Sequence, residues 1–255
     1  MRSNAFRSTV LAAALAAAPA WAQTAPTAPP PDFAVTGGAT LVTDYRFRGE
    51  SQTNKDVAVQ ATATIQHKSG LYASFWGSSI DDYVANGSDA ELDLIAGYRK
   101  NIHGTTIDGG VLYYVYPGNG GANTDFFEPY LSVSHTFGPL SAKIGGNFAW
   151  KQSGLSLDGV HREGGVYGYA ELAAAIPRTP VTVTGHLGHS FVSNYITFGQ
   201  RYTDWSIAAA YTIKQIMLGV SYVDTDDNSY SFPAGGGRNK NITRGGIVGS
   251  IGFAF

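Results

Sequence analysis

The chain has 255 residues, of which 14% are charged and 13% aromatic, with 32 glycines, no cysteine and a formal net charge of −2. A nucleic-acid-binding domain carries clustered Lys and Arg and a basic charge balance, so this composition argues against that class. The lack of cysteine excludes disulfide scaffolds, thiolate metal sites, thiol nucleophiles and a lipid anchor on cysteine. A hydrophobic share of 44% with little net charge is far from the composition of intrinsically disordered proteins.

The first 22 residues have the three parts of a secretory signal peptide. Arg2 and Arg7 form its positive end, residues 10–18 form its apolar stretch, and residues 20–22 (AWA) form a small-x-small cleavage site. The Pro- and Ala-rich residues 23–32 that follow predict an extended tether. The sequence therefore predicts an exported protein whose folded domain occupies residues 33–255.

From residue 33 onward, hydrophobic residues recur with a period of two, which is typical of β-strands. The longest uninterrupted apolar run after the tether, at residues 111–116, is far shorter than the roughly 20 residues that a membrane-spanning helix needs. One face of each segment carries branched and aromatic residues, and the other is small, polar or charged. Clear examples of the apolar face are Val57, Val59, Ala61, Ala63 and Ile65, and, at the end of the chain, Ile247, Gly249, Ile251, Phe253 and Phe255.

The connections between these segments are alternately short and long. Short turns lie at residues 68–70, 101–104, 138–139, 177–180 and 214–215, and longer connections lie at 49–56, 81–89, 117–124, 151–164, 193–201 and 227–242. Eleven connections join twelve strands, each long enough to cross a bilayer when tilted. An even strand number, alternating faces, short turns at one end and long loops at the other are typical of outer-membrane barrels. The sequence therefore predicts an all-β, twelve-stranded antiparallel transmembrane β-barrel with both termini periplasmic, in which a first strand at about 34–48 pairs with a last strand at about 243–255.

A soluble β-sandwich or closed barrel is the alternative, with the apolar faces turned inward. A sandwich has turn signals every 8–12 residues, whereas like turns here recur roughly every 35 residues. Trp150, Trp205, Tyr45 and Phe47 lie near predicted strand ends and are expected to form an aromatic belt at the lipid headgroups. The last residue, Phe255, ends an alternating strand, a pattern similar to the signal that the barrel assembly machinery reads.

Four blocks of the sequence resemble one bacterial family. The run LVTDYRFRGESQ at residues 41–52 is similar to the N-terminal signature of the TorF-family porins, also termed Gcw_chp. GLYASFWGS at 70–78, ELDLIAGY at 91–98 and YYVYPG at 113–118 are similar to later blocks of that family. Glu50 and Thr43 depart from it, since an aliphatic residue and Ser are usual there. The resemblance is dense over residues 40–118 and implies a barrel with a pore, without naming a solute.

Charged residues at alternate strand positions are expected to face the lumen, because a lipid-facing Arg near the membrane midplane costs about 2–4 kcal/mol. The sequence thus predicts a narrow pore lined by both signs of charge, which filters solutes by size and charge. In the alternative, these groups form ion pairs that fill the lumen. Barrel width does not decide between the two, because a twelve-stranded barrel is wider than the eight-stranded barrels that side chains fill and narrower than the sixteen-stranded barrels that form open channels. The predicted pore-lining residues are Asp44, Arg46 and Arg48 on the first strand, Glu91, Asp93 and Arg99 on the fourth, and Asp108, Glu128, Lys143 and Glu171 on others.

The other chemistry-bearing residues do not form a recognisable site. His186 and His189 are three apart on a predicted strand and so face opposite sides, and neither a metal site nor a cofactor is predicted. A barrel-embedded lipid hydrolase would need Ser, His and an orienting group in contact, whereas His189 and Ser190 are adjacent and face apart. Pro129 removes a hydrogen-bond donor from the sixth strand and indicates a bulge or a strand rim.

Together these features predict an outer-membrane porin or channel for passive diffusion of small hydrophilic solutes, and not an enzyme. Its expected partners are outer-membrane lipid, lipopolysaccharide and the barrel assembly machinery, with no nucleic acid. Two alternatives stay open: a non-conducting barrel that acts structurally or binds ligands through its external loops, and, with less support, the lipid hydrolase.

Overall fold

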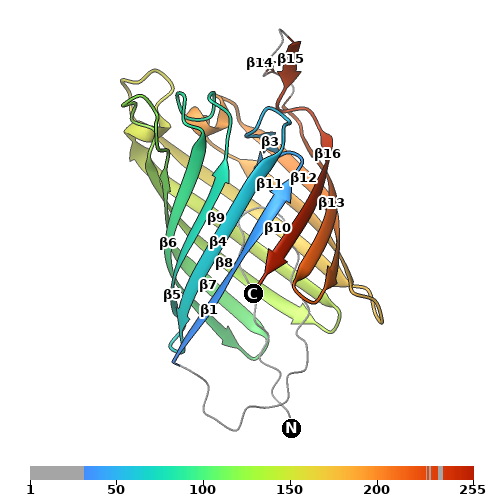
Figure 1. Ribbon diagram of the computed structural model, residues 1–255. Coiled ribbons are helices and arrows are strands. Elements are labelled where there is room, and N and C mark those ends of the chain that lie inside the picture. The colour runs from blue at the N-terminus through green and yellow to red at the C-terminus, as the bar shows by residue number, and fades with distance from the viewer. Residues whose placement is uncertain (1–31, 228, 230, 235–237) are drawn as a thin grey trace.

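The computed structural model describes residues 32–227, 229, 231–234 and 238–255, and these form a closed antiparallel β-barrel (Figure 1). The predicted signal peptide and nearly all of the predicted tether lie outside the described residues. Two single-turn 3-10 helices, η1 (Ser153–Leu155) and η2 (Tyr195–Thr197), lie in loops. Within the described ranges, no helix is long and apolar enough to span a membrane.

Twelve strands form the barrel, and each pairs with the barrel strands that come before and after it in the chain, with β1 pairing with β16 to close the ring. They are β1 (Phe33–Val42), β4 (Ala58–His67), β5 (Leu71–Ser79), β6 (Ala90–Ile102), β7 (Thr105–Val115), β8 (Phe126–Phe137), β9 (Leu140–Gln152), β10 (Glu163–Ala175), β11 (Val181–Ser190), β12 (Tyr202–Ile213), β13 (Ile216–Thr225) and β16 (Gly246–Ala254). Two small hairpins stand apart from this sheet: β2 (Arg46–Phe47) with β3 (Glu50–Ser51), and β14 (Ser231–Ala234) with β15 (Arg238–Asn241). The predicted fold class and strand number are confirmed.

The first and last strands close the barrel, as the sequence predicts. The ladder between β1 and β16 runs from Gly38 opposite Ala254 to Val42 opposite Ser250. Beyond it, Gly37 and Phe255 exchange two backbone hydrogen bonds, with N–O distances of 3.1 and 2.9 Å. Both ends of the folded domain therefore lie at the same end of the barrel.

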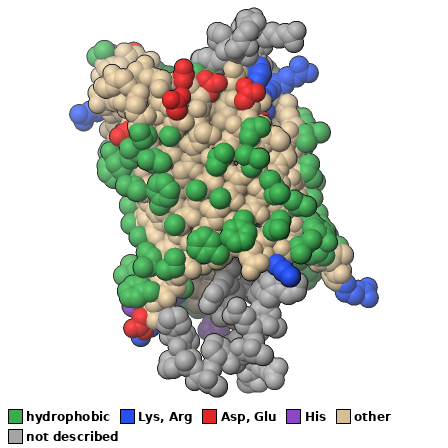
Figure 2. Space-filling model, viewed as in Figure 1, with side chains coloured by type: hydrophobic (Ala, Val, Ile, Leu, Met, Phe, Trp, Pro, Cys, Tyr) green, Lys and Arg blue, Asp and Glu red, His purple; other side chains and the backbone are tan. Residues whose placement is uncertain are grey.

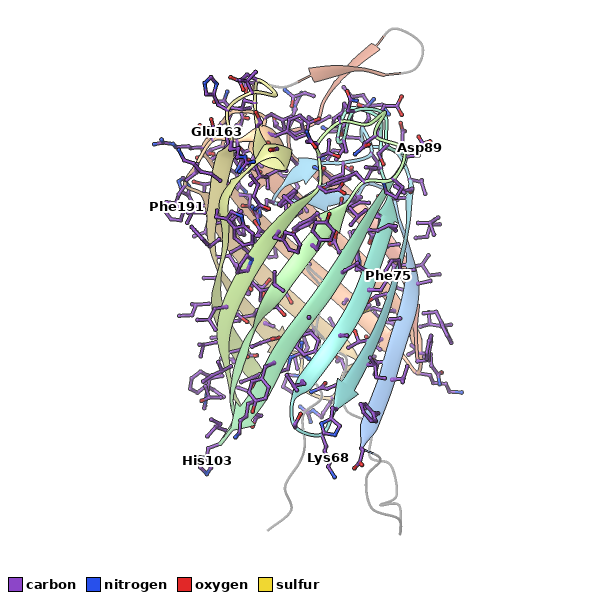
Figure 3. All side chains as sticks on the ribbon, turned by 90° about the vertical axis from the view of Figure 1, so that its left-hand side faces the viewer. Lys68, Phe75, Asp89, His103, Glu163 and Phe191 are labelled. Atoms are coloured by element: carbon purple, nitrogen blue, oxygen red, sulfur yellow. The ribbon has the colours of Figure 1, made fainter. Side chains whose placement is uncertain are left out.

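The two ends of the barrel differ in their connections. Lys68 and His103 lie at one end, hereafter the short-turn end, and Asp89 and Glu163 lie at the other, the long-loop end (Figure 3). At the short-turn end, His103 and Gly104 both have positive φ angles, 49° and 85°, as a two-residue type I′ hairpin requires. The alternation of short and long connections thus follows the predicted pattern.

Hydrophobic side chains cover the outer wall, and charged side chains gather toward its two ends (Figure 2). Along β4, Val59 and Ile65 are exposed while Gln60 between them is buried inside the barrel. The apolar faces predicted from the period of two are therefore the outer ones. A soluble barrel would place them inside, because burial of apolar surface drives its folding.

The structure corrects one element. The first strand ends at Val42 rather than near residue 48, so Asp44, Arg46 and Arg48 do not lie on a barrel strand. They belong to residues 43–57, hereafter the inward loop, which contains β2 and β3 and contacts the inner wall of the barrel. Tyr45 and Phe47 are consequently not part of an outer aromatic belt: Tyr45 is buried and Phe47 packs against Tyr114, with ring centroids 6.2 Å apart. Trp150 and Trp205 are exposed on the outside.

Candidate functional site

The inward loop turns back on itself through the β2–β3 hairpin. Arg48 and Gly49 at its tip have φ angles of 47° and 86°, and consecutive left-handed residues are the signature of a type I′ turn. A Cβ atom on Gly49 would lie 2.4 Å from Cγ2 of Thr225, the last residue of β13. The tip therefore touches the barrel wall so closely that only glycine fits.

Ion pairing and hydrogen bonds hold the base of the inward loop. Arg46 Nε donates to Asp44 Oδ2 at 2.6 Å, and Ser51 Oγ donates to the other Asp44 oxygen at 2.6 Å. Arg46 Nη1 also donates to the carbonyl oxygens of Ile242 and Arg244, at 3.3 and 3.2 Å. This buried pair thus joins the inward loop to the segment that leads into β16.

Arg48 at the tip binds the opposite wall. Its Nη2 donates to both carboxylate oxygens of Glu128 on β8, at 2.7 and 2.8 Å, and its guanidinium lies 4.3 Å from the ring centroid of Tyr167 on β10. Glu128 also accepts hydrogen bonds from the Tyr114 hydroxyl and the Asn147 amide. Because breaking a buried ion pair leaves an uncompensated charge, this contact ties the loop firmly to β8.

A second contact joins the loop to β6. The Tyr45 hydroxyl donates to Glu91 at 3.3 Å, and the Tyr45 ring packs against Trp76 of β5 with centroids 5.3 Å apart. Asp93 lies two residues after Glu91 on the same inner face and is buried. Within the described part of the chain, its Oδ1 has no hydrogen-bond partner.

Glu50 provides a third contact, with β12. Its side chain is fully buried at 0% exposure, and its Oε2 accepts a hydrogen bond of 3.0 Å from the Tyr202 hydroxyl. Its Oε1 has no partner among the described residues. Burial raises the pKa of the Glu50 carboxyl well above its usual value; Asp227 and Asp204 also raise it, while the Tyr202 hydrogen bond and Arg46 oppose the shift. Burial without a partner on Oε1 therefore favours the protonated, neutral form of the Glu50 carboxyl.

Toward the short-turn end, further charges on the inner wall form ion pairs with each other. Arg99 Nε donates to Asp108 Oδ2 at 2.8 Å, between the neighbouring strands β6 and β7. The Tyr72 hydroxyl donates to the other Asp108 oxygen at 2.8 Å and contacts the Tyr130 hydroxyl. This group links the inner faces of β5 to β8.

A second group of charges continues around the wall from β9 to β12. Lys143 lies 3.3 Å from Glu171, and Glu171 also contacts His186 Nδ1 at 3.3 Å. His186 Nε2 lies 3.1 Å from Asp204, whose carboxylate accepts hydrogen bonds from Tyr167. Since Tyr167 also packs against Arg48, this group meets the tip of the inward loop.

The opposite side of the lumen carries uncharged side chains. The inward positions of β13, β16, β1 and β4 alternate with exposed hydrophobic residues and bear no Asp, Glu, Lys or Arg within the described segments. The lumen is therefore two-sided, with charges on β6 to β12 and neutral groups elsewhere. Typical members of the neutral side are Ser221, Ser250, Thr36, Thr40, Thr62 and Thr64.

The structure brings together most of the predicted pore-lining residues, in pairs that the sequence does not specify. The pairs are Asp44 with Arg46, Arg48 with Glu128, Arg99 with Asp108, and Lys143 with Glu171. Glu91 binds Tyr45, and Asp93 has no cation within salt-bridge distance among the described residues. Sequence reasoning missed five participants, Glu50, Tyr167, His186, Tyr202 and Asp204. Strand alternation could have placed His186 and Asp204 inside the barrel, since the residue after each, Leu187 and Trp205 respectively, is an outward hydrophobic residue.

The chain matches a family profile and is similar to solved structures of outer-membrane proteins. The profile of a family of bacterial proteins of unknown function, Gcw_chp, matches residues 25–249. The NanC porin is 15% identical with a TM-score of 0.52, over 87% of this chain and 99% of that one. An outer-membrane channel from Pseudomonas putida F1 is 13% identical with a TM-score of 0.51, over 91% of this chain and 99% of that one. At these identities the likeness shows the fold alone, and no curated protein matches the sequence.

Proposed function

The chain belongs to the Gcw_chp family of bacterial proteins, and we propose that it is an outer-membrane channel through which small hydrophilic solutes diffuse passively. The proposal includes membership of the TorF porins, which the family match does not address. It also includes the absence of enzymatic activity, which is supported by the ion pairs that the lumenal charges form with one another.

The outer wall supports insertion in a membrane. Hydrophobic side chains cover it and charges gather at its ends (Figure 2), as expected of a barrel with an apolar outer band. In the orientation that we propose, the long-loop end faces the outside and the short-turn end, with both ends of the folded domain, faces the periplasm. The predicted signal peptide would deliver the chain to that compartment.

The inward loop is the observation that carries the proposal. It reaches from β1 into the lumen and contacts β6, β8 and β12 through Tyr45, Arg48 and Glu50. A loop held at three points of the inner wall narrows the lumen at the long-loop end. Charges on one side and neutral groups on the other would orient polar solutes along this path.

The close burial of this loop favours one second candidate, a non-conducting barrel that acts through its external loops. Glu50, Ser51 and Thr243 are fully buried where the loop meets the wall. In this candidate the inward loop is a permanent plug. Ion conductance separates the two functions, because a plug passes no current.

Single-channel recording of the refolded mature protein in a planar bilayer tests the proposal. We expect reproducible current steps, with selectivity measured as the reversal potential across a salt gradient. Lys143→Gln should shift the preference toward cations and Glu171→Gln toward anions, because each removes one charge from the inner wall. Lys100→Gln, which removes an exposed positive charge, is the matched control. Silence from a folded, heat-modifiable barrel would contradict the channel and favour the plugged barrel.

A further inference from the structure

A hollow of about 390 Å³ lies near the long-loop end, outside the lumen, where β7, β8 and β9 meet their loops. This hollow, hereafter the rim pocket, falls within the size range of small-ligand sites, roughly 300–1,000 Å³. Its lining residues belong to neither the lumen nor the inward loop. The lining includes Tyr113, Phe127 and Trp150, the cations Lys151 and Arg162, and the acid Asp125.

Pro129 explains why the strands separate here. The ladder between β8 and β9 ends at Tyr130 opposite Asn147, one residue short of Pro129, which has no N–H to donate. Beyond that point the Gln152 side chain, rather than the backbone of β9, forms hydrogen bonds with the backbone of β8. Its Oε1 accepts from the Phe127 N–H and its Nε2 donates to the Phe127 carbonyl, both at 2.8 Å. The two strands thus stay joined while a space opens between them.

The floor of the rim pocket is a row of three stacked rings. Tyr113 and Phe127 lie 4.2 Å apart at an interplanar angle of 21°, and Phe127 and Trp150 lie 5.9 Å apart at 15°. Phe127 is 40% exposed and Trp150 46% exposed. Aromatic faces of this kind are apolar surfaces with a polar handle on Trp and Tyr, and they occur at membrane interfaces.

Lys151 and Arg162 add positive charge beside these rings. Neither has a carboxylate within salt-bridge distance among the described residues, unlike the lumenal cations. Asp125, the acid of the rim pocket, is already engaged: its Oδ1 accepts from the Tyr116 N–H at 3.0 Å and its Oδ2 from the Tyr113 hydroxyl at 3.5 Å. Two cations are thus available to an anionic group, and Arg in particular matches phosphate geometry.

We propose that the rim pocket binds the phosphorylated sugar headgroup of an outer-leaflet glycolipid. Lys151 and Arg162 would bind its phosphate, the ring row would lie against its sugar face, and its acyl chains would follow the hydrophobic outer wall. The proposal rests on the proposed outer-membrane location and orientation. The charge and the aromatic platform together select this class over neutral phospholipids, which lack both a net negative charge and a sugar.

Native mass spectrometry of the detergent-solubilised protein with added lipid tests the proposal. The probes are hexa-acylated lipid A, its dephosphorylated form, phosphatidylglycerol and phosphatidylethanolamine. We expect lipid A to bind most strongly. Lys151→Ala and Arg162→Ala should each weaken it about tenfold, as expected for loss of a charge-assisted hydrogen bond. Trp150→Ala should weaken both lipid A and its dephosphorylated form.

The matched control is the double variant Arg201→Ala/Arg244→Ala. It removes two exposed charges before β12 and β16, away from the rim pocket, and should bind lipid A as the wild type does. Equal loss in this control, unchanged binding in the Lys151 and Arg162 variants, or equal binding of phosphatidylglycerol and lipid A would overturn the proposal. Its failure is distinct from failure of the channel, because the rim-pocket variants should leave single-channel conductance unchanged.

Discussion

At the scale of single residues, Arg48 lies in the hairpin turn and Glu50 directly follows it, and the two contact different strands of the inner wall by different means. Arg48 binds Glu128 through two hydrogen bonds, so its charge is compensated. Glu50 has a hydroxyl donor on one oxygen and no partner on the other among the described residues. Arg48 therefore holds the loop through an ion pair, and Glu50 is expected to make the position of the loop depend on pH.

Arg48→Ala should release the tip of the inward loop. Glu128 would keep a buried charge without its cation, a change that costs about 3–5 kcal/mol. We expect a lower thermal unfolding temperature and larger, noisier single-channel currents. Adding Glu128→Gln should restore much of the stability but not the original conductance, since the loop still lacks its tether. Unchanged currents in Arg48→Ala would show that this contact does not set the width of the pore.

Protonation of Glu50 should favour the inward position of the loop. Its pKa is raised in the buried state, so the buried state binds more protons than a state in which Glu50 meets water. The inward position is then most stable below the pKa of an exposed carboxyl, about 4.3, and loses stability as the pH rises toward the raised value.

We therefore expect channel opening to increase with pH in bilayer recordings, and the Glu50→Gln variant to lose this dependence. Asp89→Asn, which changes an exposed acid at the long-loop end, is the control and should keep the wild-type profile. The groups that face Glu50 are Tyr202 and Asp204 from β12, Asp227 and Arg46. A wild-type channel whose opening falls with rising pH would refute the assignment.

At the scale of elements, the β2–β3 hairpin depends on Gly49. Its φ of 86° disfavours any side chain, and a Cβ would meet Thr225 and Asp204 at 2.4 and 2.8 Å. Gly118 offers a close comparison, because its φ is 80° and a Cβ there has nothing within 4 Å. The two positions separate the backbone cost of a side chain from its steric effect on the wall.

Gly49→Ala should therefore be more disruptive than Gly118→Ala. Both pay the left-handed backbone penalty of about 1–2 kcal/mol, but only Gly49→Ala pushes the hairpin away from β12 and β13. Thermal unfolding should show the larger loss for Gly49→Ala, and only that variant should change the single-channel conductance. Equal effects of the two variants would mean that the hairpin tolerates displacement.

At the scale of the whole molecule, the proposed orientation makes the two ends chemically distinguishable. Val160 in a long loop is 78% exposed, and Ser69 in a short turn is also exposed. The chain has no cysteine, so single Val160→Cys and Ser69→Cys variants carry one reactive thiol each. A membrane-impermeant maleimide should label Val160→Cys on intact cells and Ser69→Cys only after lysis. The reverse labelling pattern would show that the barrel has the opposite orientation in the membrane.

The number of strands, the apolar outer faces and the closure of the first strand on the last were all predictable from the sequence. These follow from side-chain alternation and turn residues, which are local properties of the chain. Alternation misplaces the first strand's end, because Asp44, Arg46 and Arg48 alternate with Tyr45 and Phe47 just as strand residues would.

The path of the inward loop, the pairing of the charges and the position of the rim pocket could not be predicted from the sequence. Each depends on groups that closure of the barrel brings together from distant strands, such as Arg48 with Glu128 and Glu50 with Tyr202. Their energies come from desolvation and pairing inside the closed wall. A period of two predicts which side chains lie on the inner face, but it does not predict which residue of a distant strand each of them contacts.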